Sequence, residues 1–159
     1  MIDFYGEKEY INFIKNCERL CRASLEYKQW VQQKREQGGW RCVITEVTLD
    51  DASIEIHHTP FTLYDLIETV MFNIDFQTTF DVCNHVMKLH LGDYVGWSPL
   101  SKTTHEQVHN GSIVIPIQFV FGNYQYIFDH YKLTEDIASR VNVRVEQMSE
   151  AKVILGVKK

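Results

Sequence analysis

Residues 53–60 read Ser-Ile-Glu-Ile-His-His-Thr-Pro, and residues 99–111 read Pro-Leu-Ser-Lys-Thr-Thr-His-Glu-Gln-Val-His-Asn-Gly. These two windows hold four of the seven histidines of the chain. In the first window, isoleucines alternate with polar residues, which predicts a half-buried strand. Its polar face would carry Glu55 and His57, and His58 would follow at the end of the strand. In the second window, a threonine can cap a helix that ends at the glycine.

The second window also places two histidines at a spacing that suits a metal ion. His105 and His109 are four residues apart, so on a helix they lie on one face, one turn apart. Two imidazoles at this spacing can bind one ion. Together with His57, they would hold a divalent ion with open coordination positions, while His58 would stay unligated. That arrangement suits phosphodiester hydrolysis, in which the ion offsets developing charge and the free imidazole of His58 accepts a proton from water as the general base.

The composition sets bounds on the class of protein. The chain has 159 residues, 45% hydrophobic and 23% charged, which is the range of an ordinary globular protein and predicts one domain, 1–159. The formal net charge of −5 does not favour binding to phosphates through overall charge, so nucleic-acid binding would need a local basic face or a metal ion. No apolar run reaches the length of a membrane span, and no secretory signal is visible. The four cysteines lack the spacing of a disulfide framework, which favours the cytoplasm.

Helices are predicted on both sides of the first window. Apolar residues recur every three or four positions from residue 7 to 36, which predicts an N-terminal helical arm, 1–39, with a break near Ser24. Two further helices, at 63–72 and 80–90, would form an inserted segment, 62–91, between the histidine windows. Thr62 would cap the first of these helices, and Thr78 or its neighbour the second.

Three strands are predicted besides the histidine-bearing one. Residues 40–48 would pair with it as a hairpin, and residues 94–100 would form a short extended segment. The apolar run at 113–121 is strongly β-prone, although its proline favours an edge position. The C-terminal segment, 112–159, would hold this strand, a short helix at 124–131 and a last helix from Thr134. The fold class that these elements indicate is α+β.

The histidine windows resemble a known family. The sequence Glu55-x-His57-His58, followed by a proline and later by His105-x-x-x-His109, is similar to the HNH or ββα-metal endonuclease motif, nearest to the colicin-type DNases. The resemblance implies an HNH core at 40–111, with helices added before, within and after it. It also implies that His57, His105 and His109 are metal ligands, that His58 is the general base, and that Glu55 orients the site.

The activity implied by the resemblance is metal-dependent hydrolysis of DNA. The ion would be Zn²⁺, Mg²⁺, Mn²⁺ or Ni²⁺, and three imidazoles favour a transition metal over magnesium. Where the family has an asparagine that braces the base-bearing loop, this chain has Gly96. The small chain and compact motif also resemble proteins encoded by bacteriophages, and such a protein would act in the host cytoplasm.

Other interpretations remain open at this point. A pair such as His57 and His58 can be two strand-end histidines with ordinary hydrogen bonds, and an amphipathic helix can carry two histidines without a metal. The alternatives to a nuclease are a catalytically inactive HNH-like module that binds a protein partner, and a structural domain around a closed metal site. The sequence leaves the oligomeric state open.

Overall fold

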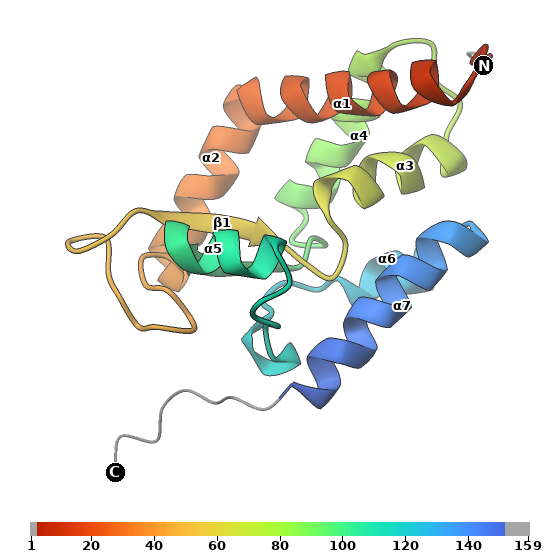
Figure 1. Cartoon of the computed structure of the whole chain (residues 1–159). Helices are drawn as coiled ribbons and strands as arrows, with labels where there is room; N and C mark the ends of the chain where they lie inside the picture. Colours follow the sequence, from red (N-terminus) through yellow and green to blue (C-terminus); the bar gives the residue numbers. More distant parts are fainter. Residues whose placement is uncertain (1–2, 152–159) are drawn as a thin grey trace.

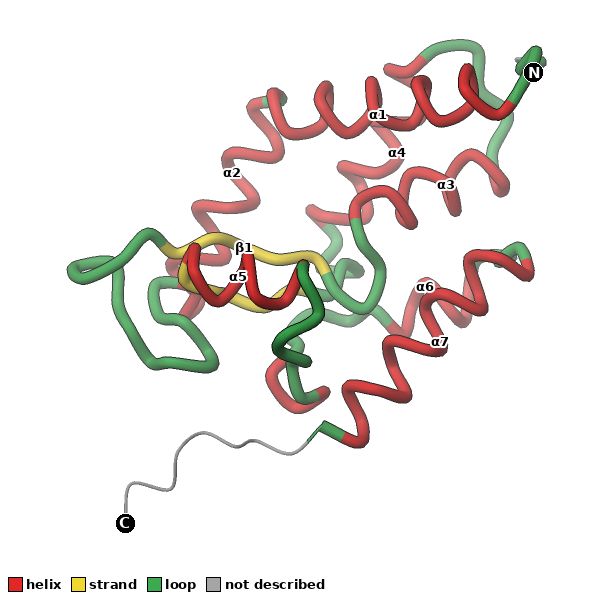
Figure 2. The backbone as a smooth tube through the Cα atoms, in the orientation of Figure 1, coloured by secondary structure: helices red, strands yellow, loops and turns green. Residues whose placement is uncertain are grey.

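Seven α-helices and one two-stranded antiparallel sheet make up the described part of the chain, residues 3–151, in the computed structural model (Figure 1 and Figure 2). The fold is therefore α+β, as predicted. The helices are α1 (Glu7–Ala23), α2 (Leu25–Lys34), α3 (Leu63–Asn73), α4 (Thr79–Leu91), α5 (Lys102–His109), α6 (Gln125–His130) and α7 (Glu135–Glu150). The strands are β1 (Ile54–His58) and β2 (Trp97–Ser101), and two short helical turns, η1 (Arg35–Gly39) and η2 (Ile117–Phe119), complete the elements.

Local hydrogen bonds set the helix boundaries that the sequence predicts. Ser24 has extended backbone angles, and its hydroxyl accepts a hydrogen bond from the Tyr27 amide at 3.1 Å, so it ends α1 and caps α2. Thr62 and Thr78 each form a reciprocal capping box with an aspartate three residues later, which begins α3 and α4. The predicted break near Ser24 and the predicted helices 63–72 and 80–90 are confirmed.

The histidine-bearing strand pairs with a segment more than forty residues away. β1 and β2 are antiparallel, with Glu55 opposite Leu100 and His57 opposite Ser98. The predicted hairpin with residues 40–48 is wrong, because that segment forms tight turns of its own and keeps only an isolated bridge between Arg41 and Thr48. Its backbone groups bond within the segment, as when the Cys42 amide donates to the carbonyl oxygen of Val47, or to β2, as when the Val43 amide donates to that of Pro99. Residues 40–48 therefore contact the β2 side of the sheet and do not pair with β1.

The C-terminal segment confirms two helices and corrects one strand. The predicted helices at 124–131 and from Thr134 are α6 and α7. Residues 113–121 do not form a strand: Pro116, which has no amide hydrogen, is followed by the η2 turn, and a single bridge joins Phe121 to Trp97. The end of the predicted segment 112–159 lies outside the described residues.

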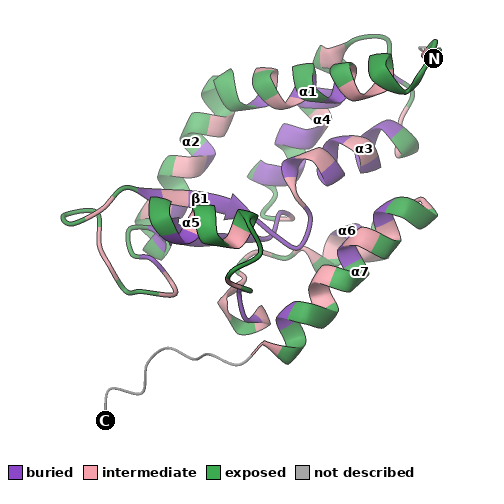
Figure 3. Cartoon of the chain, in the orientation of Figure 1, coloured by how far each residue is buried: buried purple, intermediate pink, exposed green. Residues whose placement is uncertain are grey.

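The buried apolar side chains form two clusters, and the sheet contributes residues to both. The larger cluster fills the space between the helices and includes Ile56 of β1 and Trp97 of β2. The smaller one includes Leu100 of β2 and is contacted by Val108 of α5. Figure 1 shows α5 lying against the sheet, and Figure 3 shows that the strands are buried while much of α5 is exposed. The histidines of β1 therefore lie between a helical core and a short, accessible helix.

Candidate metal centre

Strand geometry sends neighbouring side chains of β1 to opposite faces of the sheet. Glu55 and His57 face α5, where their side chains meet those of His105 and His109. Ile56 and His58 face the helical core. The two adjacent histidines of the first window are thus in different environments.

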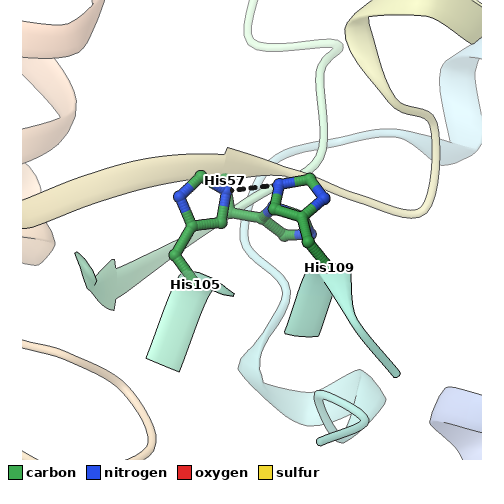
Figure 4. A group of neighbouring side chains, drawn as sticks. All are labelled: His57, His105 and His109. Carbon is green, nitrogen blue, oxygen red and sulfur yellow. Dashed lines mark hydrogen bonds between the residues drawn. The ribbon is translucent and has the colours of Figure 1, made fainter. Parts of the chain in front are cut away.

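Three imidazoles come together on the α5 side (Figure 4). His57 comes from β1, and His105 and His109 come from adjacent turns of α5. Each offers one ring nitrogen, and these nitrogens all lie within 4.8 Å of one another. The Nε2 atoms of His105 and His109 are 2.9 Å apart. The structure therefore brings together all three residues predicted as metal ligands.

Glu55 holds one of these rings in place. Its carboxylate contacts Nδ1 of His105 in a short hydrogen bond. A carboxylate at Nδ1 favours the tautomer with its proton on that nitrogen, which leaves the lone pair of Nε2 directed at the cluster. This is the carboxylate–histidine pairing that commonly supports metal-bound imidazoles, and it places Glu55 beside a ring that it is predicted to orient.

The environment lowers the pKa of two of the three imidazoles. Burial, together with the neighbouring charges of His105, His109 and Arg144, lowers the pKa of His57 to about 3. Burial and His105 also lower the pKa of His109. Because a metal ligand must be deprotonated, lowered pKa values favour metal binding at neutral pH.

The donor set fits a divalent transition metal. Zinc–nitrogen bonds are about 2.0–2.1 Å long, so two nitrogens on one ion lie roughly 3 Å apart, close to the Nε2 separation of His105 and His109. Three neutral imidazoles suit zinc, nickel or another transition metal better than magnesium. Within residues 3–151 the group has three such ligands, and an ion bound by three protein ligands retains a position for water or substrate.

His58 does not join this cluster. Its Nε2 lies 2.9 Å from Nε2 of His90, and its ring stacks on Trp30 with centroids 5.4 Å apart. His58 is only 6% exposed, and burial and its neighbour His90 hold its pKa well below the usual value. The prediction that His58 is free to act as the general base beside the ion is therefore wrong, because its imidazole faces the helical core and is engaged there.

His90 is the partner that sequence reasoning missed. It lies on α4, is fully buried, and its Nδ1 donates to the carbonyl oxygen of Val86 at 2.8 Å. Nε2 is then the acceptor for a proton carried by His58. The apolar stripe of α4 indicates a buried histidine at this position, but nothing in the sequence pairs it with His58.

Close backbone packing explains why a glycine stands at position 96. A Cβ atom at this position would lie 2.0 Å from the carbonyl oxygen of Thr59. The backbone carbonyl of Gly96 instead accepts a hydrogen bond from the Thr59 amide at 3.1 Å. The main chain of Gly96 therefore braces the segment after His58, where the resemblance leads one to expect an asparagine side chain.

A cavity of about 440 Å³ adjoins the cluster. His57 and His109 lie on its wall, and Arg144 and Gln147 of α7 also line it. Apolar residues form much of the remaining lining: Val108, Ile113, Val114, Ile115 and Met148. An ion held by the three imidazoles would thus face a space large enough for a small ligand.

Comparison with known proteins places the chain in a phage family. Residues 1–155 match the family model described as Bacteriophage G278-like virion protein. Neither the curated proteins nor the solved structures contain a match to the chain. Among the described residues, no helix has the length and apolar character needed to cross a membrane. The match over nearly the whole length confirms the expected bacteriophage origin, and the chain belongs to the family of Bacteriophage G278-like virion proteins.

Proposed function

We propose that this protein is a component of the phage particle that binds a divalent transition metal through His57, His105 and His109 and hydrolyses phosphodiester bonds of DNA as an HNH-type endonuclease. The observation that carries the proposal is the convergence of three imidazole nitrogens within 4.8 Å of one another. Two antiparallel strands followed directly by a histidine-bearing helix also form the order of elements that a ββα-metal motif requires.

The residues divide the chemistry among themselves. His57, His105 and His109 hold the ion, and Glu55 fixes the ring of His105. A divalent ion held by these residues would supply positive charge to offset that of the phosphate oxygens. It would also make water a better acid, so that hydroxide could form near neutral pH with the proton lost to solvent and without a separate imidazole base. The cavity beside His57 and His109 gives the scissile phosphate room to approach.

Two observations favour a second candidate, a non-catalytic module of the virion that binds a protein partner. The imidazole of His58 is engaged with His90 and is not free to move a proton at the cluster. The net charge of −5 gives DNA no general electrostatic attraction. A structural metal domain is less well supported, because a closed site needs a fourth protein ligand and the described cluster has three.

Metal titration tests the ligand set first. Protein freed of metal with EDTA should bind one Zn²⁺ or Mn²⁺ per chain in calorimetry, and His57→Ala and His109→Ala should each lose most of that affinity. His130→Ala is the matched control, since His130 is an exposed histidine on α6. Unchanged affinity in His57→Ala or His109→Ala would remove the proposed site.

Plasmid nicking then separates the two functions. The metal-loaded protein should convert supercoiled plasmid to the nicked form, and the EDTA-treated protein should not. Tight metal binding without any nicking, over a range of divalent ions, would contradict the nuclease and leave the binding module as the function.

A further inference from the structure

The lining of the cavity beside the cluster includes a guanidinium group whose orientation is fixed by its neighbours. Nη1 of Arg144 donates to the carbonyl oxygen of Pro60 at 3.0 Å and, in a short contact, to the carboxylate of Asp65. Asp65 is 1% exposed and also accepts hydrogen bonds from Arg140, the residue one turn earlier on α7. The arrangement ties α7 to α3 and holds Arg144 before any ligand arrives.

The other edge of this guanidinium is available to a ligand. An arginine has five N–H donors, and the contacts described above use the two on Nη1. Within residues 3–151, Nε and Nη2 have no hydrogen-bond partner, and the side chain is 32% exposed. A planar group with three unused donors, already fixed in place, suits the oxygens of a phosphate.

Arg144 and the cluster share one space. Both line the cavity of about 440 Å³, together with Gln147, which lies almost one turn beyond Arg144 on α7. The positive charge of Arg144 is one of the causes that lower the pKa of His57, so the two groups are within electrostatic range. Valine and isoleucine side chains cover another part of the wall.

We propose that this cavity is the binding site for one nucleotide unit of a nucleic-acid strand, with Arg144 and Gln147 holding the phosphodiester against the histidine cluster. The inference rests on the proposed function for the identity of the strand, and it adds the residues that recognise the phosphate. The volume of about 440 Å³ lies in the range of sites for small ligands, which fits a single nucleotide unit. The apolar wall would contact the attached sugar or base.

Binding can be measured without any reaction. The probe is a fluorescein-labelled oligothymidylate of six nucleotides, followed by fluorescence anisotropy with metal-free protein in EDTA. Arg144→Gln should weaken binding about tenfold, because it removes a charge-assisted hydrogen bond to phosphate. Gln147→Glu should weaken binding similarly by repulsion, and since Gln147 is exposed on α7, this change leaves the packing intact.

Arg140→Gln is the matched control, because it breaks a contact to the same Asp65 carboxylate but lies outside the cavity lining. It should bind the oligonucleotide like the unaltered protein. If Arg144→Gln and Gln147→Glu bind no more weakly than Arg140→Gln, or if the unaltered protein does not bind the probe, the proposed site is overturned.

Hydrolysis of bis(p-nitrophenyl) phosphate by metal-loaded protein distinguishes this proposal from the nuclease itself. If the unaltered protein hydrolyses this ester, Arg144→Gln should lower kcat/KM while Zn²⁺ affinity in calorimetry stays unchanged. If it hydrolyses neither this ester nor plasmid but the binding losses occur as expected, the nucleotide site stands and the nuclease falls. If hydrolysis occurs and Arg144→Gln keeps the full kcat/KM, the nuclease stands and the role of Arg144 is refuted.

Discussion

Lowering the pH from 7 to 5 should destabilise the fold through the buried pair of His58 and His90. Burial lowers the pKa of His90 to about 4, whereas an unfolded histidine has a pKa of about 6.5. Above pH 6.5 both states are neutral at this residue, so its contribution does not change with pH. Between pH 6.5 and 4 the unfolded chain binds a proton that the folded chain does not, so stability falls as the pH falls.

The size of the effect follows from the shift in pKa. Each pH unit within this window costs about 1.4 kcal/mol per histidine, which gives about 2 kcal/mol for His90 between pH 7 and pH 5. The pKa of His58 is also lowered by burial and by His90, so its contribution has the same sign. Other ionisable groups change stability over this range too, and a variant is needed to isolate the pair.

His90→Gln provides that variant, because its amide oxygen can still accept a hydrogen bond from His58 but the side chain does not titrate. Urea unfolding followed by tryptophan fluorescence, in EDTA at pH 7 and pH 5, gives the free energy of unfolding of each protein. The stability advantage of the unaltered protein over His90→Gln should shrink by about 2 kcal/mol between pH 7 and pH 5. For His130→Gln, at an exposed position, the free energy of unfolding should change between pH 7 and pH 5 by the same amount as for the unaltered protein. An equal gap at both pH values would refute the reasoning.

Three further changes test other parts of the structure. Glu55→Gln should weaken Zn²⁺ affinity about 10- to 100-fold in calorimetry, because it removes the charge that orients the ligand His105. Glu106→Gln, on the exposed side of α5, should leave the affinity unchanged. Equal effects of the two substitutions would contradict the role of Glu55. Asp65→Asn should lower the free energy of unfolding by about 2–3 kcal/mol, since it leaves two partly exposed arginines of α7 without their shared charge; urea denaturation measures this, and no loss would contradict it. Gly96→Ala should cost about 3 kcal/mol by the same assay, because the added Cβ would lie 2.0 Å from the Thr59 carbonyl oxygen; a stable variant would show that the loop has room to move.

Local features of the sequence predicted the helices well. A cap such as Ser24 or Thr62 acts on amides two or three residues away, so the residues that decide the boundary stand next to it. The periodic apolar positions of α1 and α7 likewise belong to the element that they define. The helix predictions, which depend on such short distances, are therefore confirmed.

Strand pairing could not be predicted in the same way. The apolar pattern of β1 shows that one face is buried but not which segment supplies its partner, and residues 40–48 were the nearest β-prone candidate. The ladder instead joins Ile54 to Ser101 and His58 to Trp97, across the inserted helices. The predicted extended segment at 94–100 does overlap β2, but nothing in its own pattern pairs it with β1.

The site was predictable where spacing along one element fixes it and not where distant elements meet. His105 and His109 converge because α5 is a helix, and His57 joins them because β2 leads directly into α5. His90 and Arg144, by contrast, reach β1 and the cavity from α4 and α7 through tertiary packing. No pattern within either helix shows those contacts.

The side chain of His58 faces the helical core because strand β1 extends one residue beyond His57. If β1 ended at His57, the chain would be free to turn and could direct both imidazoles to the same side. Because the ladder continues through His58 and Trp97, the alternation of a strand applies to both histidines and separates them across the sheet. His58 then anchors the strand to Trp30 and His90 while His57 faces α5. Truncating His58 would therefore remove contacts on the core side of the strand and disturb the position of His57. Loss of cleavage in a His58 variant identifies a general base only if the stability and Zn²⁺ affinity of that variant are unchanged.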